Sequence, residues 1–219
     1  MQIQTAPNPG TLKSLPKKQG PQGTPPPPPP GDDHYKRQQD LCFGGALGAA
    51  AYLGSTAGPS VYLHELGHKM AVQTLYSGTT ATISIDPFKG GVTRWSAQGL
   101  SPLGQHLGEH ASRSVVAMAG TAMDALSSCA LFAAGYKLRK KHPLAGNAMM
   151  GYGIMNMTNS TLYAASGIGK GAATAKAGHD FVTLQAQAGI PCWVSTAVVA
   201  SLIPLTYLVM RSLDKEIAK

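Results

Sequence analysis

The uncharged stretch "LCFGGALGAAAYLGSTAGPSVYL", residues 41–63, runs directly into "HELGH", residues 64–68. At about 1.5 Å per residue, a helix over the first stretch is long enough to cross the roughly 30 Å apolar layer of a bilayer. Its many small residues favour close packing against other helices in a membrane. The second stretch sets two histidines four residues apart, beside a glutamate. We therefore expect a membrane span that ends in metal-binding side chains.

Charged residues are scarce and unevenly distributed along the chain. Asp, Glu, Lys and Arg make up 13% of the 219 residues, about half the usual share of a soluble domain. The net charge of +8 comes from short clusters at the ends of apolar runs. Because no basic helix face is present and the basic residues are not interleaved with aromatic ones, we expect a lipid bilayer and no nucleic acid as the partner. The three cysteines stand singly, which indicates neither a disulfide framework nor a thiolate metal site.

Three further segments are mostly apolar: residues 112–136, 143–169 and 181–210. Together with the first stretch they predict about four spans, the last of which begins near Pro191. After the first span, residues 78–95 alternate β-branched with other residues around a proline and a paired glycine, which is typical of a β-hairpin. The predicted fold class is therefore mainly α, a polytopic membrane helical bundle of about four spans with a small β-hairpin insertion after the first span.

The first forty residues differ in composition from the rest. They hold most of the prolines, including the run 25–30, and almost no aliphatic residues to bury. We interpret residues 1–40 as a disordered proline-rich N-terminal tail. Residues 41–219 then form a membrane-embedded domain.

Basic clusters predict how the spans are oriented. They precede the first span and follow the second and the fourth: Lys36, Arg37, Lys137, Arg139, Lys140, Lys141, Arg211 and Lys215. Since cytoplasmic loops carry the excess of Lys and Arg, a multi-pass protein with both termini in the cytoplasm fits this distribution. "HELGH" and the segment "AGHDF", residues 177–181, are then expected at the same membrane boundary, opposite the basic clusters.

The "HELGH" motif has the spacing of a zinc protease site. Residues four apart share one face of a helix, so His64 and His68 can bind one ion while Glu65 flanks it. Zinc with three protein ligands keeps a position for water and lowers the pKa of that water toward about 7, and a glutamate accepts its proton. Glu65 is therefore the predicted catalytic residue, and Zn²⁺ is the predicted cofactor.

A third ligand has to come from the titratable residues in or beside apolar segments, which are Asp124, His142, His179 and Asp180. Asp180 is the preferred metal ligand because it lies on the same predicted side as the two histidines, whereas His142 lies on the opposite side. Asp124 remains the alternative, since an acid inside a span usually has a partner or a function. His179 is expected to support a ligand without binding the metal.

Five segments, "HELGHKMA", "IDPFKGGVTRW", "AMAGTAMDAL", "NMTNSTLYA" and "GHDFVTLQAQAGIP", follow one another within residues 41–210. In this order they resemble the site-2 protease family of intramembrane zinc metalloproteases, most closely its small bacterial members. The resemblance implies that His64, His68 and Asp180 bind zinc and that Glu65 activates the water. Phe181 follows Asp180 where the family commonly has glycine.

The predicted function is a zinc-dependent endopeptidase that hydrolyses peptide bonds of membrane-anchored protein substrates. The resemblance also suggests a substrate-binding or oxyanion role for Asn156 and Asn159, although amides in membrane helices more often bond neighbouring helices. Two alternatives stay open. One is a soluble zinc metalloprotease whose apolar runs form a helical core, and the other is a catalytically inactive membrane adaptor that retains the motif.

Overall fold

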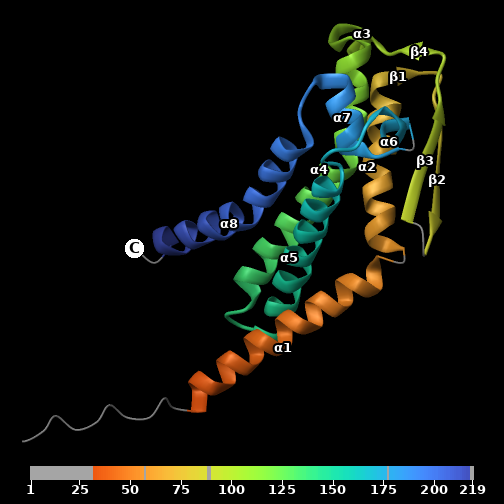
Figure 1. Ribbon diagram of the computed structural model, residues 1–219. Coiled ribbons are helices and arrows are strands. Elements are labelled where there is room, and N and C mark those ends of the chain that lie inside the picture. Colours follow the sequence, from red (N-terminus) through yellow and green to blue (C-terminus); the bar gives the residue numbers. More distant parts are fainter. Residues whose placement is uncertain (1–31, 57, 88–89, 177, 218–219) are drawn as a thin grey trace, which may run out of the picture.

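The computed structural model describes residues 32–56, 58–87, 90–176 and 178–217, which form a mainly helical molecule with a small β-hairpin (Figure 1). In chain order the elements are α1 (Asp32–Ser55), α2 (Pro59–Leu75), β1 (Tyr76–Ser77), β2 (Thr80–Asp86), β3 (Gly90–Ser96), β4 (Gly99–Leu100), α3 (Pro102–Leu107), α4 (Glu109–Leu138), α5 (Pro143–Ser166), α6 (Ala172–Lys176), α7 (Asp180–Ala188) and α8 (Cys192–Ile217). The predicted mainly α fold and the predicted hairpin are confirmed.

Helix α1 begins inside the segment predicted as the tail. Residues 32–40 are helical; they contain no proline, and the Lys, Arg and Gln among them favour helix. The expected boundary at residue 40 therefore comes several residues after the start of the helix. Residues 1–31 of the predicted tail lie outside the described residues.

The predicted first span is divided into two helices. Helix α1 ends at Ser55 and α2 begins at Pro59, so the chain turns just before the "HELGH" motif (Figure 1). Proline is favoured at the first position of a helix, where its missing N–H leaves no bond unmade, and it disfavours a helical residue before it. A single continuous helix over residues 41–63 is therefore wrong.

Among the described residues, two helices are long and apolar enough to cross a membrane, namely α4 and residues Cys192–Leu213 of α8. In the most apolar stretch of each helix, 33% of the residues are buried in α4 and 17% in α8. Large apolar side chains point outward instead, with Leu126 68%, Trp193 64% and Leu208 57% exposed. Within residues 181–210, Gly189 in the left-handed conformation (φ 69°) ends α7, and the apolar helix α8 begins at Cys192, next to Pro191 where the fourth span is predicted to begin.

Glycines allow α1 and α5 to pack closely. Gly44, Gly48 and Tyr52 recur every four residues and form the buried face of α1. A side chain at Gly48 would run into the carbonyl oxygen of Ala148 and would come within 2.7 Å of the backbone nitrogen of Tyr152. Backbone-to-backbone contact of this kind is typical of helices that associate in membranes.

A second close approach brings α2 against α4. A side chain at Gly67, inside the "HELGH" motif, would collide with the carbonyl oxygen of Ala119. The C-terminal half of α2 is anchored by a buried cluster of Val72, Leu75 and Tyr76. The face of α2 that carries the motif is therefore pressed onto the middle of α4.

The hairpin runs alongside α2. Strands β2 and β3 pair antiparallel, from Thr80 opposite Ser96 to Asp86 opposite Gly90, and the short pair β1 and β4 closes the base of the hairpin. Figure 1 shows both long strands beside α2, on the side away from α5. The hairpin therefore covers one side of the motif-bearing helix.

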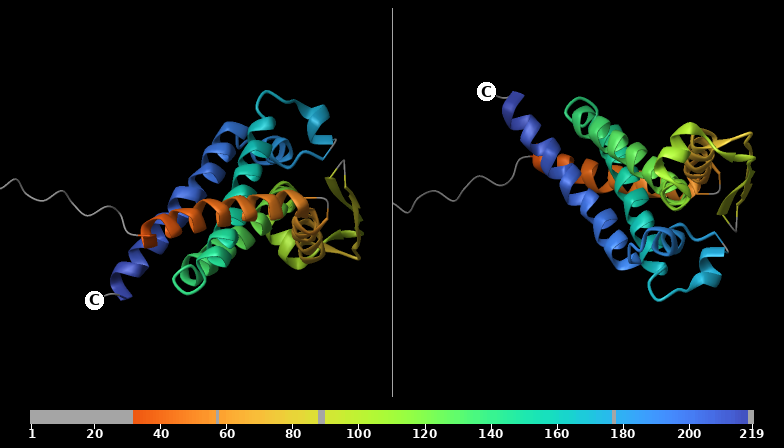
Figure 2. Two further views of the ribbon diagram at one scale, coloured as in Figure 1. Left: turned by 90° about the horizontal axis from the view of Figure 1, so that it is seen from below. Right: turned by 90° about the horizontal axis from the view of Figure 1, so that it is seen from above.

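The predicted basic clusters lie at one end of the molecule. In both views of Figure 2, the start of α1, the α4–α5 turn and the end of α8 lie on the side away from the hairpin. Contacts agree with this, since the Asn147 side-chain amide donates to the carbonyl oxygen of Asp40 at 3.2 Å, and Met210 packs in one buried cluster with Tyr136. The Arg139 guanidinium lies 3.8 Å from the centre of the Tyr136 ring.

The α1–α5 contact predicts opposite effects for two matched substitutions. Gly48→Ala should lower the free energy of unfolding by about 1–3 kcal/mol, because the added carbon overpacks a backbone contact. Gly54→Ala, in the same helix but with no atom within 4 Å of the new carbon, should be neutral or stabilise by up to about 1 kcal/mol through helix propensity. Thermal unfolding of the purified full chain measures both. Equal effects at the two positions would contradict this packing.

Candidate metal centre

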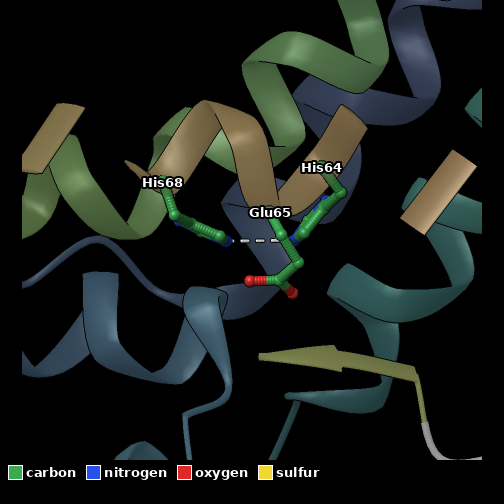
Figure 3. Close-up of side chains that lie close together, drawn as sticks. All are labelled: His64, Glu65 and His68. Atoms are coloured by element: carbon green, nitrogen blue, oxygen red, sulfur yellow. Dashed lines mark hydrogen bonds between the residues drawn. The ribbon is translucent and has the colours of Figure 1, made fainter. Parts of the chain in front are cut away.

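Helix α2 holds the two histidines of the motif on one face. The Nε2 atoms of His64 and His68 lie 3.1 Å apart (Figure 3), and the ring centres lie 4.8 Å apart. The spacing of four residues gives this shared direction, as the sequence predicts. His68 is buried, and the His64 side chain is 18% exposed.

Asp180, the first residue of α7, reaches the same point from far along the chain. Its Oδ2 atom lies 3.1 Å from His64 Nε2 and 3.4 Å from His68 Nε2. Asp180 itself is 7% exposed. The segments "HELGH" and "AGHDF", which the charge distribution predicted on the same side, therefore meet directly.

The opposite nitrogen of each imidazole is already engaged. His64 Nδ1 donates to Asp124 Oδ2 at 2.8 Å, and His68 Nδ1 donates to the carbonyl oxygen of Val116 at 2.7 Å. With a proton on each Nδ1, the neutral rings present lone pairs at Nε2. Two such lone pairs and a carboxylate oxygen then converge on one point, so the arrangement needs either a proton on one Nε2 or a metal ion between them.

The size of this triangle fits a metal ion. Two ligands held about 2.0–2.1 Å from a tetrahedral ion are about 3.3 Å apart, and the three observed separations are 3.1, 3.1 and 3.4 Å. Gly120 of α4 lies against the two rings, and a side chain there would come within 2.5 Å of both Nε2 atoms. The space that a side chain would fill is therefore left open at the point where the three donors converge.

Asp124 has a different place from Asp180. It meets only Nδ1 of His64, on the side of the ring away from the shared point, and it is 8% exposed. A carboxylate in this position fixes the tautomer and the orientation of a ligand histidine. The choice of Asp180 over Asp124 as third ligand stays a prediction, which this geometry supports.

The other candidates from the sequence are more distant. The Asn156 side chain donates to the carbonyl oxygen of Asp124 at 3.3 Å and to Ser128 Oγ at 2.8 Å, so it ties α5 to α4. Asn159 is exposed. His142 precedes α5 at the opposite end of the molecule. Asn156 therefore supports the helix that carries Asp124.

Glu65 is buried between α2 and the hairpin. Its carboxylate lies on the same side of α2 as the two rings (Figure 3), and the ligand atoms of the three residues lie within 4.8 Å of one another. The Thr93 hydroxyl lies 2.7 Å from Glu65 Oε2 and 3.0 Å from the Glu65 carbonyl oxygen, in position to donate to either. Gly91 leaves room for this carboxylate, since a side chain there would come within 2.8 Å of Oε1.

Tyr163 and His179 support the start of α7. The Asp180 N–H donates to the Tyr163 hydroxyl at 3.1 Å, and the Tyr163 ring stacks on His179 at 4.5 Å between centres. His179 Nε2 contacts Ser166 Oγ at 3.0 Å, and burial lowers the pKa of His179. As the sequence predicts, His179 lies next to a ligand candidate without joining the three converging donors.

A cavity of about 450 Å³ opens onto these residues. Its walls come from α2, β3, α4, α5 and the segment around α6 and α7. Cavities of this size are typical of substrate sites. The three converging donors and the Glu65 carboxylate therefore face a space that can hold a ligand.

Sequence reasoning missed three supporting residues: Thr93, Gly120 and Tyr163. Gly120 stands four residues before Asp124, so a shared helix face could have indicated it. Thr93 follows the paired glycine of the predicted hairpin, but no local pattern connects it to Glu65. Tyr163 carries no sequence signal for its bond to the α7 backbone.

No protein-family model, no curated protein and no solved structure matches this chain. The interpretation of the site therefore rests on the residues and their geometry.

Two aspartate substitutions should affect metal binding differently. Asp180→Ala should abolish binding of a divalent metal, because it removes one of three converging donors. Asp124→Ala should keep the metal with about 10- to 100-fold lower affinity, the usual effect of losing the carboxylate behind a ligand histidine. Elemental analysis and chelator competition on the purified full chain measure both, with Asp40→Ala at the far end of the molecule as the control. Loss of metal only in Asp124→Ala would identify Asp124 as the ligand.

Proposed function

We propose that this protein is a membrane-embedded zinc endopeptidase of the site-2 protease type, which hydrolyses peptide bonds of membrane-anchored proteins. The observation that carries the proposal is the convergence of His64 Nε2, His68 Nε2 and Asp180 Oδ2 within 3.1–3.4 Å, with both Nδ1 atoms engaged elsewhere. Two imidazoles and one carboxylate are a common ligand set of catalytic zinc. His64, His68 and Asp180 would hold the ion.

In this proposal each side chain has a separate task. A zinc ion held there supplies Lewis acidity, which polarises the scissile carbonyl and lowers the pKa of water beside it. Glu65 accepts a proton from water as the oxygen attacks the carbonyl carbon, and then passes the proton to the amine nitrogen as the C–N bond breaks. Thr93, which lies 2.7 Å from Glu65 Oε2, keeps the carboxylate in position.

Exposed apolar surface supports a membrane location. Helix α8 from Trp193 to Arg211 is about 27 Å long, close to the roughly 30 Å of bilayer hydrocarbon. Its apolar side chains point away from the protein, among them Trp193, Leu205 and Leu208 at 54–64% exposure. We propose that α1 with α2, and α5, complete a bundle of about four spans around α4 and α8.

The orientation follows from the basic clusters. They gather at the end of the molecule away from the hairpin (Figure 2), and we propose that this end, with both termini, faces the cytoplasm. Asp124, whose carboxylate holds His64, lies fifteen residues before Arg139 on α4, or about 22 Å along the helix. The candidate site then lies toward the opposite boundary of the bilayer, where water can reach it.

The hairpin provides a surface for the substrate. Gly91, Val92, Thr93 and Trp95 of β3 line the cavity. An extended peptide can add to the edge of a strand through main-chain hydrogen bonds. We propose that an unwound segment of the substrate lies between β3 and the converging donors.

Glu65→Gln tests the proposed chemistry. It should abolish hydrolysis of a membrane-anchored substrate while zinc binding persists, because the three ligand atoms are unchanged and only the proton acceptor is lost. Turnover in proteoliposomes and zinc content are measured on the same preparation. Absence of hydrolysis by the unmodified protein would contradict the proposal and favour the inactive adaptor. A Glu65→Gln variant with full turnover would contradict the role of Glu65 as the proton acceptor.

The membrane location predicts behaviour during extraction. The full chain expressed in cells should stay with the membrane pellet after alkaline carbonate washing and should dissolve only in detergent. The reason is that α4 and α8 expose large apolar side chains along their outer faces. Immunoblots of the two fractions measure this. Recovery of folded chain in the supernatant without detergent would favour the soluble zinc metalloprotease.

A further inference from the structure

The cavity continues along α4 beyond the three candidate metal ligands. Arg113, Val116 and Ala117 line it, and together with Gly120 they fall on one face of the helix at spacings of three, four and seven residues. Arg113 lies two turns before Gly120, which is about 10 Å along the axis. The cavity therefore leads from the two Nε2 atoms to a guanidinium.

Arg113 supplies the positive charge of the cavity wall and is accessible from water. Among the described residues that line the cavity, it is the one Lys or Arg. Its side chain is 53% exposed, and its Nε–H donates to Glu109 Oε1 at 2.6 Å, one turn earlier on α4. A guanidinium has five N–H donors, of which the bond to Glu109 uses one. The Tyr76 hydroxyl also donates to Glu109 Oε1, at 3.4 Å. An exposed ion pair of this kind contributes little free energy, so a competing carboxylate can replace Glu109 at little cost.

We propose that Arg113 binds a carboxylate of the substrate about three residues from the cleaved bond. This inference rests on the proposed peptidase function and adds a substrate class, peptides that carry an acidic group at that distance. An extended chain advances about 3.3 Å per residue, so three residues match the axial rise of about 10 Å along α4 between Gly120 and Arg113. A guanidinium pairs with a carboxylate through two parallel N–H···O bonds, which gives both attraction and register.

The carboxylate has two chemical sources. It is either the side chain of Asp or Glu within the substrate, or the free carboxylate at the end of a chain cleaved earlier. Both present the same planar group to Arg113. Peptides with an internal Glu and an amidated end, compared with peptides that have a neutral interior and a free end, distinguish the two sources.

Glu109 allows a second, independent test of the role of Arg113. Its carboxylate occupies Arg113 and repels an incoming acid. Glu109→Gln should therefore strengthen the preference for acidic peptides, whereas Arg113→Gln should remove it. If the ion pair had only a structural role, both substitutions would change the preference for acidic peptides in the same direction, because either one breaks the pair.

The experiment uses the full-length protein in detergent with zinc and two matched peptide libraries. Both libraries have random uncharged sequences and amidated ends; one carries a single Glu, and the other carries Gln at the same position. Mass spectrometry identifies the cleaved bonds, and kcat/KM is compared between the libraries. A third library, uncharged inside but with a free carboxyl end, tests the second source. Arg139→Gln, a matched loss of an arginine at the other end of α4, is the control.

We expect the unmodified protein to prefer Glu over Gln by about two- to fivefold at one position near three residues from the cleaved bond, the range of an exposed ion pair. Arg113→Gln should reduce this ratio to about one, Glu109→Gln should raise it, and Arg139→Gln should leave it unchanged. High salt should weaken the preference. Zinc content and thermal unfolding confirm that each variant is folded.

Cleavage of all libraries at equal rates, or a preference that survives in Arg113→Gln, would overturn the role of Arg113 and leave the peptidase function standing. Absence of cleavage by the unmodified protein, or equal cleavage by Glu65→Gln, would overturn both. A preference confined to the library with free ends would identify the terminal carboxylate as the source.

Discussion

One carboxylate oxygen held against two imidazole nitrogens is the interaction on which the rest of this structure depends. Asp180 Oδ2 lies 3.1 and 3.4 Å from the Nε2 atoms of His64 and His68. Bare Nε2 lone pairs and an ionised acid would repel one another, so the contact needs either a proton on one ring or a metal ion at its centre. Three elements have to meet for it to form: α2 supplies the histidines, α7 supplies the acid, and α4 supplies Gly120, whose missing side chain leaves room for both rings.

The helices meet closely because small residues are placed where their backbones cross. Gly67 on α2 and Gly48 on α1 would each collide with a backbone carbonyl if they carried a side chain. The large apolar side chains point the other way, toward the outside of α4 and α8. Such a distribution suits a solvent of hydrocarbon, in which buried apolar area gives little driving force and close backbone packing holds helices together. The same packing positions α2 against α4 and so fixes the two imidazoles.

Much of the architecture follows from local sequence patterns. The alternation around the paired glycine predicts the hairpin, and the apolar run before the basic cluster at Lys137 predicts α4, because both patterns reflect periodicities of a single element. Pro59 is present in the sequence, but the continuous apolar composition around it favoured one long span over two helices. Whether a proline kinks a helix or begins a new one depends on how the two halves pack, and α1 packs on α5 whereas α2 packs on α4. Local composition does not carry that information.

For the site, the sequence by itself determined the pair His64 and His68 with Glu65, because a spacing of four residues puts two rings on one face of any helix. It also limited the candidates for the third metal ligand to two aspartates and two histidines, since titratable groups in apolar segments are rare. Only the tertiary structure brought Asp180 to Nε2 and Asp124 to Nδ1 of the same ring. The physical reason is that each aspartate reaches the ring through the packing of separate helices, and no pattern within either segment records which side of an imidazole it will meet.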